Sequence, residues 1–341
     1  MKQTAEGQPP NRGDRRERSC LQTLRGQAGA ALVLAALAGA LSLASRNFAT
    51  FDNLENILRL SSFIGIVAAG ETLVILTGGI DLGVGSYVGL TGCLAAGLMT
   101  GFADGPTLPP SAALAIGIGA GALMGLVNGG LIAFAKMPPF IVTLAAMMIA
   151  RGLAEVYTNG QTVSGLPASC NWLTGEIYPF GPVLAVPVTA IVMLVVFAVL
   201  AGLGARTSFG RSIYAVGGNQ EAARLSGVNV ARVKLLVYAI SGALSGLAGV
   251  LLIFRLHGGI STNGDMYEMD AIAACVIGGT SLSGGVGTVG GTLIGILIMG
   301  CVRTGLTLLN VSANWQRVII GLIILAAVGM DLIRRRMRSE A

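Results

Sequence analysis

The sequence contains little charge for its length. Of its 341 residues, 11% are Asp, Glu, Lys or Arg, whereas soluble domains carry about 25%. Hydrophobic residues make up 53% of the chain, and the mean hydropathy is +0.76. No stretch is long and polar enough to form a separate external domain. The composition therefore excludes a soluble protein and predicts an all-α, polytopic bundle that spans a membrane.

Residues typical of catalytic and metal sites are also scarce. The three lysines, Lys2, Lys136 and Lys234, all stand outside any GxxxxGK[ST] loop, so the chain has no such route to ATP. The GxSxG and HExxH motifs are absent. A single histidine, His257, excludes a His-cluster metal site. We therefore expect no enzyme activity, no metal site and no cofactor bound by this chain.

Cysteine spacing and the distribution of charge exclude two further classes. The five cysteines form no CxxC pair, so no disulfide framework is indicated. The net charge of +6 is compatible with nucleic-acid binding, but the cations gather at the ends of apolar runs and form no separate basic domain. Membrane orientation explains them better, and we expect no nucleic-acid partner.

Apolar runs recur along the chain and predict about ten transmembrane helices within residues 28–333. The first run follows a long arginine-rich tail, residues 1–27, so we interpret it as a retained anchor and the tail as disordered. The eighth run is too short to cross a bilayer unless residues 268–270 extend it. The expected spans are 28–44, 61–77, 83–98, 112–134, 139–157, 183–203, 235–254, 271–279, 287–302 and 318–333.

Most of the 22 lysines and arginines fall on one side of this predicted topology. That side holds the N-terminal tail, the segment 204–234 and the basic C-terminal tail 334–341. The loops 102–110 and 158–182, expected on the other side, contain no lysine or arginine. By the positive-inside rule, both termini are expected in the cytoplasm.

Segment 204–234 is the one long interior stretch that is dense in cations. Asn219 can cap a short helix, whose positive end Glu221 favours. Gly227 can end that helix, and Asn229 can cap the next one. We predict a short helix that lies across the cytoplasmic face of the membrane.

The 51 glycines are about twice the ordinary number and indicate close helix packing. Gly117, Gly121, Gly125 and Gly129 recur every fourth residue and form one stripe. The pairs Gly242 with Gly246 and Gly291 with Gly295 repeat this spacing. We expect another helix to cross close to the stripe, within the chain rather than between two copies.

Paired glycines interrupt two apolar regions. Gly78 and Gly79 precede Asp81, which we expect to cap the next helix and, as a second interpretation, to line a polar pathway. A related pattern follows Gly278 and Gly279, in the sequence VIGGTSLSGGVGT of residues 276–288. Two such breaks in corresponding parts of two halves point to a transport pathway, although coincidence in so glycine-rich a chain is an equal alternative.

Polar residues inside expected spans are further candidates for the pathway. Glu71 has no cation nearby in sequence, and it is either a buried neutral acid or a pathway residue. Arg151 and Glu155 are four residues apart and share a helix face, so pairing is one explanation for them. Asn128 is expected to bond to another helix. The complete set of pathway candidates is Glu71, Asp81, Asn128, Thr143, Arg151 and Asp270.

Four long stretches resemble the membrane permease subunits of ribose-type ABC sugar importers. They are residues 72–86, 138–160, 209–234 and 268–295, and the resemblance covers nearly all of residues 48–333. It implies a dimeric permease in the bacterial inner membrane. It also implies a separate ATPase subunit that binds ATP and Mg, and a sugar-binding protein, periplasmic or lipid-anchored, that delivers the substrate.

The resemblance also assigns the contact with the ATPase. Glu221, Ala222, Ala223 and Gly227 resemble the EAA-xxx-G signature of importer permeases, although the usual following proline is missing. Glu71 stands where an uncharged residue such as Met is expected. The coupling residues implied are Gly210, Arg211, Gly217, Gly218, Asn219, Glu221, Ala222, Ala223 and Gly227.

We interpret the chain as a permease for a ribose-like monosaccharide that a partner ATPase drives through alternating access. A bulky residue at Gly218 is expected to uncouple ATP hydrolysis from transport. An ion-coupled secondary transporter, with Glu71, Asp81 or Asp270 carrying protons, and a membrane scaffold without substrate flux are the alternatives.

Overall fold

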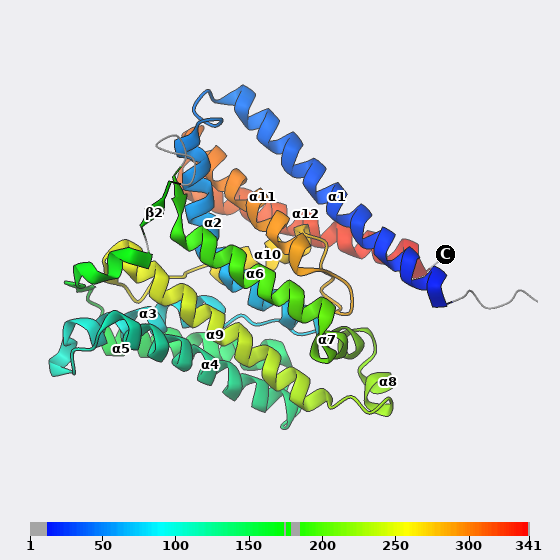
Figure 1. The fold of residues 1–341 in the computed structure, drawn as a ribbon, viewed down its shortest axis with the longest axis horizontal. Coiled ribbons are helices and arrows are strands. Elements are labelled where there is room, and N and C mark those ends of the chain that lie inside the picture. Colours follow the sequence, from blue (N-terminus) through cyan, green and yellow to red (C-terminus); the bar gives the residue numbers. More distant parts are fainter. Residues whose placement is uncertain (1–11, 174, 179–184, 340–341) are drawn as a thin grey trace, which may run out of the picture.

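The computed structural model describes residues 12–173, 175–178 and 185–339 (Figure 1). Helices dominate this part of the chain, and eight of them are long and apolar enough to cross a membrane. These eight lie in α1 (Arg12–Ala44), α2 (Phe51–Leu76), α4 (Pro110–Ala133), α5 (Pro139–Thr158), α6 (Val188–Arg206), α9 (Val230–Leu256), α11 (Val289–Leu308) and α12 (Ala313–Ser339).

Shorter elements connect the long helices. Two apolar helices, α3 and α10, lie inside the bundle, and α7 and α8 lie at its surface. Their bounds are α3 (Val84–Thr100), α7 (Ser208–Gly218), α8 (Gln220–Leu225) and α10 (Tyr267–Ile277). The remaining elements are the 3-10 turns η1 (Phe102–Asp104) and η2 (Ala168–Leu173), and the strands β1 (Val163–Ser164), β2 (Glu176–Ile177), β4 (Val186–Pro187) and β5 (Gly258–Gly259), which pair antiparallel as β1 with β5 and β2 with β4.

The all-α polytopic fold is confirmed, and the expected spans correspond to ten of the helices. The eighth span differs, because α10 has 11 residues even though it begins at Tyr267, ahead of residues 268–270. Residues 12–27, which we expected to be disordered, belong to α1, and residues 1–11 lie outside the described part.

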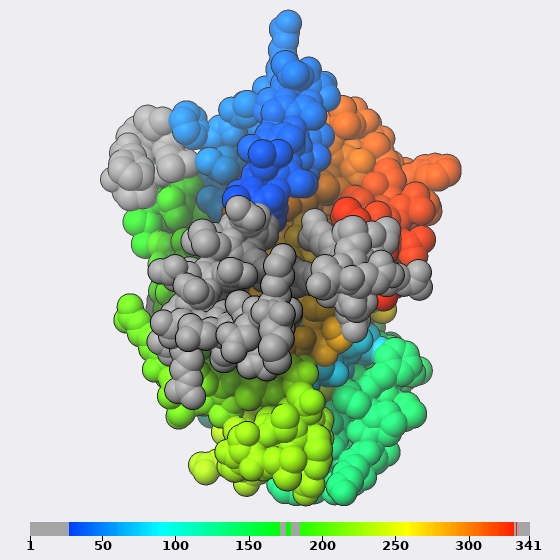
Figure 2. Space-filling view, turned by 90° about the vertical axis from the view of Figure 1, so that its right-hand side faces the viewer, coloured from blue at the N-terminus to red at the C-terminus, as the bar shows by residue number. Residues whose placement is uncertain are grey.

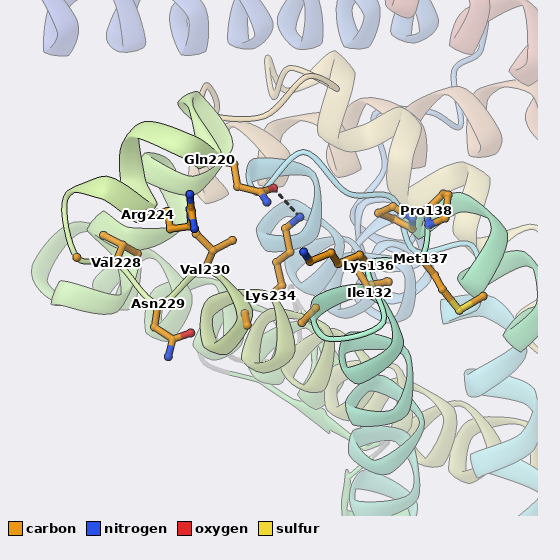
Figure 3. Close-up of a pocket in the computed structure, with 14 residues that line it drawn as sticks. Ile132, Lys136, Met137, Pro138, Gln220, Arg224, Val228, Asn229, Val230 and Lys234 are labelled. Carbon is orange, nitrogen blue, oxygen red and sulfur yellow. Dashed lines mark hydrogen bonds between the residues drawn. The ribbon is translucent and has the colours of Figure 1, made fainter.

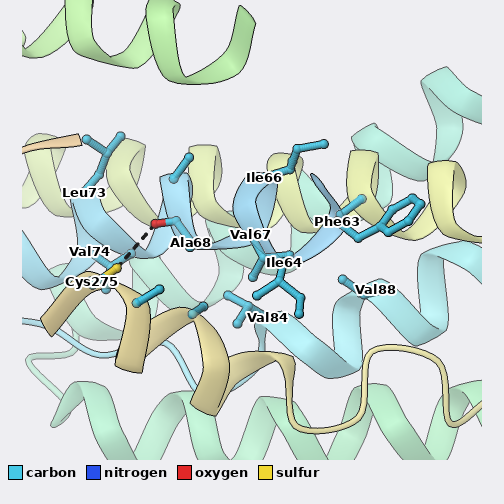
Figure 4. Close-up of a cluster of buried hydrophobic side chains, with 14 of the residues drawn as sticks. Phe63, Ile64, Ile66, Val67, Ala68, Leu73, Val74, Val84, Val88 and Cys275 are labelled. Carbon is cyan, nitrogen blue, oxygen red and sulfur yellow. Dashed lines mark hydrogen bonds between the residues drawn. The ribbon is translucent and has the colours of Figure 1, made fainter. Parts of the chain in front are cut away.

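Helix α2 lies at the centre of the bundle. In the most apolar 18-residue segment of α2, 78% of the residues are buried, whereas in the corresponding segment of α1 only 6% are buried. The difference arises because α6, α9, α10 and α11 all pack against α2. Figure 4 shows Phe63, Ile64 and Val67 of this helix beside Val84 and Val88 of α3. The Sγ of Cys275 in α10 donates to the carbonyl oxygen of Ala68 across 3.5 Å, also drawn there.

The expected glycine stripe is the face of α4 that packs on α9. A Cβ atom on Gly121 would overlap the carbonyl oxygen of Gly242, and one on Gly242 would overlap the carbonyl oxygen of Gly121. In the same way, a Cβ on Gly246 would overlap the carbonyl oxygen of Gly117. Only hydrogen atoms fit between these backbones, so the prediction of a closely crossing helix is confirmed.

Both ends of the described chain lie on the same side as the surface helices. Figure 1 shows the beginning of α1, the end of α12 and the helices α7 and α8 at the right-hand side of the bundle. Figure 2 looks onto that side, where α1 (dark blue), α12 (red) and the loop of α8 (yellow-green) are visible together. The turn η1 and the strands β1 and β2 lie toward the opposite side.

Candidate functional site where a surface helix meets two helix breaks

The segment between α6 and α9 folds into two capped helices. Thr207 caps α7 by accepting a hydrogen bond from the Gly210 amide at 3.0 Å. Asn219 caps α8 through the Ala222 amide at 2.9 Å, and Asn229 caps α9 through the Arg232 amide at 3.0 Å. Together with Gly227, which adopts a left-handed φ of 84° just after α8, these caps confirm the local structure predicted there.

The structure adds helix α7, which the glycine-rich sequence did not indicate. Gly210 allows it to turn sharply, because a Cβ there would overlap the carbonyl oxygens of Leu203 and Gly204 at the end of α6. Ile213 and Val216 are buried on the inner face of α7, whereas Arg211 is exposed. The helix thus covers the end of the bundle and presents its cation outward.

Two interruptions between helices meet beneath α7. The first break, residues 77–83, follows α2, and the second break, residues 278–288, follows α10. The amide of Gly285 donates to the carbonyl oxygen of Leu76 at 2.9 Å, which joins the second break to the end of α2. Gly78 and Gly285 both have positive φ, at 78° and 73°, a conformation that glycine adopts without strain.

Gly217 joins α7 directly to the end of α2, where the first break begins, and to the second break. A Cβ atom on Gly217 would overlap the carbonyl oxygen of Leu76, and a Cβ on Gly284 would lie 3.0 Å from the carbonyl oxygen of Gly217. The Tyr214 hydroxyl also donates to the carbonyl oxygen of Gly287 at 3.0 Å. A displacement of α7 therefore presses on backbone atoms of both breaks, with no flexible side chain between them.

The exposed helix α8 carries most of the signature-like residues. Glu221 and Ala222 are exposed and Ala223 is buried. The Arg224 guanidinium donates to Glu221 at 2.6 Å and lowers the pKa of that carboxyl below its usual value. Glu221 is therefore an exposed anion, available to a partner surface.

The structure gathers four of the six pathway candidates around the first break. Glu71 and Asp81 are both fully buried, and the Glu71 carboxylate accepts the Asp81 amide at 3.1 Å. Thr143 of α5 donates to the carbonyl oxygen of Ile80 at 3.2 Å. Asn128 of α4 donates to the Tyr87 hydroxyl of α3, so its expected bond between helices is confirmed.

Asp81 lies two positions before the N-cap of α3. The N-cap of α3 is Gly83, which as a glycine has no side chain to cap the helix. The Asp81 carboxylate accepts a hydrogen bond from the Gly83 amide at 3.0 Å. The expectation that Asp81 itself caps the helix is therefore wrong in detail. One oxygen of Asp81 and one of Glu71 lack a hydrogen-bond partner among the described residues, as does the buried hydroxyl of Tyr238.

The other two candidates belong to structural contacts away from the first break. Arg151 donates to the carbonyl oxygens of Ser261 and Asn263, so the pairing considered with the exposed Glu155 is wrong. Asp270 of α10 pairs with Arg303 of α11, a partner that its distance in sequence concealed.

No cluster of metal-binding side chains occurs in the part of the chain that the structure describes. Long apolar helices, two interruptions between helices and a surface helix packed against them define a polytopic membrane permease. The chain belongs to the family described as "Branched-chain amino acid transport system / permease component", which it matches over residues 53–328.

Curated relatives include sugar permeases of bacteria. The chain is 46% identical to the ribose import permease protein of Bacillus subtilis (strain 168), over 82% of this chain and 84% of that protein. It is 44% identical to the ribose import permease protein of Escherichia coli (strain K12), over 88% and 92% of the two chains. The xylose transport system permease protein of the same strain is 37% identical, over 83% and 86%. No solved structure matches the chain significantly. The resemblance to ribose-type permeases, inferred from four motifs, is confirmed.

Proposed function

We propose that the chain is the transmembrane permease subunit of an ATP-driven ABC importer that carries a ribose-like monosaccharide. The similarity to ribose and xylose permeases along most of the chain supports the substrate class. The helical bundle supplies the route through the membrane, and ATP with Mg is bound by a separate ATPase subunit. In this proposal, no residue of the chain takes part in a chemical step.

The observation that carries this proposal is the close contact of Gly217 with the end of α2 and with the second break. In the proposed mechanism, the ATPase docks on α7 and α8, where Arg211, Glu221 and Ala222 are exposed. ATP binding and hydrolysis displace α7, and the carbonyl contact with Leu76 transmits that displacement to the first break. The breaks open or close the pathway because their positive-φ glycines allow the backbone to rotate there.

We further propose the surroundings of the subunit. Residues 28–333 form the permease domain in the bacterial cytoplasmic membrane, with both tails and residues 204–234 in the cytoplasm. The shared location of the described chain ends and the surface helices supports this orientation. A periplasmic or lipid-anchored binding protein delivers the sugar on the opposite side, and a second permease copy completes the pathway.

Gly217→Ala should uncouple the transporter. The added Cβ overlaps the Leu76 carbonyl oxygen, and overpacking of this kind costs about 1–3 kcal/mol, so sugar uptake should fall roughly tenfold. The partner ATPase should continue to hydrolyse ATP. Uptake and hydrolysis are measured together in proteoliposomes that contain the complete importer with its binding protein.

Gly204→Ala is the matched control, because open space surrounds the Cβ position of Gly204 at the end of α6. Gly218, where we expect a bulky residue to uncouple hydrolysis from transport, has open space around its Cβ position as well, so the contact inside the chain is tested at Gly217. Normal uptake in the Gly217→Ala importer would refute transmission through this contact.

An ion-coupled secondary transporter is the second candidate. The buried acids Glu71 and Asp81, which form no ion pair among the described residues, are the observation that favours it. Vesicles that hold the chain without the ATPase separate the two: uptake driven by a proton gradient in the absence of ATP supports the second candidate and contradicts the first.

A further inference from the structure

A cavity of about 670 Å³ lies between α8, the turn that joins α4 to α5, and the first turn of α9 (Figure 3). Its size is within the range of small-molecule sites, roughly 300–1,000 Å³. Among the residues the structure describes, none from either helix break lines it, so it is separate from the contact of α7 with the breaks, although it adjoins α8. Its place at the ends of α4 and α9 puts it at the boundary between the apolar bundle and the surface helices.

Three cations and no described acidic side chain line this cavity. Lys234 donates to the Gln220 side chain at 2.8 Å, which leaves two of its three donors for a ligand. No described residue forms a hydrogen bond or ion pair with Lys136. Figure 3 shows the ends of Lys136 and Lys234 turned toward one another, beside Gln220. Two converging ammonium groups repel each other, and an anion between them removes that repulsion.

The first turn of α9 adds to the positive potential. Val230 and Ala231 line the cavity, and amides in the first turn of a helix lack partners within the helix. The Asn229 side chain caps the Arg232 amide and leaves these two amides to other acceptors. The end of the long helix α9 therefore favours negative charge in the cavity.

Apart from Gln220 and Asn229, the rest of the lining is apolar and continues onto the exposed side of α5. Ile132, Met137 and Val228 contribute to the walls. Just beyond them, Phe134, which follows α4, and Phe140 of α5 are exposed to 68% and 56%. A ligand with a charged head and an apolar tail would satisfy both parts of this surface.

We propose that the cavity binds the phosphate headgroup of an anionic phospholipid, with an acyl chain lying along Met137 and Phe140. Clusters of basic residues between transmembrane helices recognise such headgroups. A free phosphate would use only the cations and leave the apolar wall without a partner. The proposed ATPase contact uses the exposed residues Glu221 and Ala222 of α8, which do not line the cavity, so it leaves the cavity to another ligand.

The bound lipid would tie α8 to the membrane-spanning part of the chain. Helix α8 has six residues, of which only Ala223 is buried, so few contacts of its own hold it in place. A headgroup that contacts both Lys136 and Lys234 bridges the α4–α5 turn to the end of α8 through Gln220. The lipid would thus fix the position of the helix that we propose as the docking element.

The test titrates the purified full-length chain in detergent with phosphatidylglycerol and counts bound lipids by native mass spectrometry. Each lysine near an anionic lipid contributes about fivefold in affinity, so Lys136→Gln with Lys234→Gln should weaken binding roughly 25-fold. Arg232→Gln is the matched control, since Arg232 is an exposed cation in the same turn of α9 that does not line the cavity. The control should bind as the unaltered chain does, and phosphatidylcholine should bind weakly to all three proteins.

A second measurement uses the unaltered chain, so that a folding defect in the variant cannot decide the result. A photoactivatable phosphatidylglycerol should crosslink to peptides that contain residues 132–139 or 224–234. Equal lipid binding by the double variant, or crosslinks only elsewhere, overturns the proposal. Displacement of the lipid by inorganic phosphate identifies a free-anion site, and displacement by the partner ATPase identifies a protein interface, and either result also overturns it.

Discussion

At the scale of single residues, long-range backbone partners decide what the buried polar groups do. Arg151 satisfies two carbonyl oxygens more than a hundred positions away, and Asp270 pairs with Arg303 on another helix. Spacing in the sequence suggested that Arg151 pairs with Glu155, and it indicated no ion-pair partner for Asp270. Neighbours in sequence predicted the caps Asn219 and Asn229, because a cap is by nature a local contact.

Glu71 provides the residue-scale prediction. Its carboxylate accepts the Asp81 amide inside the bundle, and Glu71→Gln retains a carbonyl oxygen for that bond. Glu71→Leu leaves the buried amide unpaired, which costs about 1–3 kcal/mol. We expect the Gln variant to keep both its unfolding temperature and its sugar uptake, and the Leu variant to unfold at a lower temperature in detergent.

These two variants also bear on the mode of energy coupling. A glutamine cannot carry a proton, so abolished uptake in the well-folded Glu71→Gln protein would support proton coupling and contradict a purely structural carboxylate. Sugar uptake by the Glu71→Gln variant in the complete ATP-driven importer provides the rate against which uptake without the ATPase is compared.

At the scale of elements, hydropathy predicted the long helices well and their boundaries less well. Apolar runs marked where lipid or protein surrounds a helix, but α1 and α2 begin many residues before those runs. Helix α7 was missed because glycines at 210, 217 and 218 lower helix propensity. Tertiary contacts explain two of these glycines. Gly210 and Gly217 lie where α7 approaches the carbonyl oxygens of Leu203 and Leu76, and a Cβ atom at either position would overlap those oxygens.

The crossing of α4 and α9 provides the element-scale prediction. Gly121→Ala places a Cβ on the Gly242 carbonyl oxygen and should lower stability by roughly 1–3 kcal/mol. Gly119→Ala, two residues earlier on the same helix, enters open space and should be neutral or gain up to about 1 kcal/mol from helix propensity. Thermal unfolding of both variants in one detergent measures the contrast. Equal unfolding temperatures would show that the two helices do not approach as closely as described.

At the scale of the whole molecule, the sequence identified the class of protein and left the internal assembly open. Four motifs sufficed for the family, and charge asymmetry suggested an orientation. The meeting of the two breaks beneath α7 brings together segments some two hundred residues apart, a contact that pattern and spacing do not specify. The paired-glycine similarity identified both segments as breaks but gave no reason to place them in contact.

Orientation is the whole-molecule prediction. Ser226→Cys, exposed just after α8, should react with a membrane-impermeant maleimide only after the cells are permeabilised. Thr107→Cys, exposed in the loop that contains η1, should react in intact cells. The native Cys93, Cys170, Cys275 and Cys301 are buried, and Cys20 is replaced by Ser in both proteins. Labelling of position 226 in intact cells would reverse the proposed topology and remove the basis for ATPase docking.

The backbone-to-backbone seam of α4 and α9 has a mechanical consequence. Because only hydrogens fit between Gly121 and Gly242, we expect the two helices to move together as one rigid body. Its α9 half spans 27 residues, about 40 Å, from the capped turn at Asn229 to the ribbon that β5 forms with β1. We therefore expect a force applied to the pair at one face of the bilayer to tilt both helices together rather than bend them.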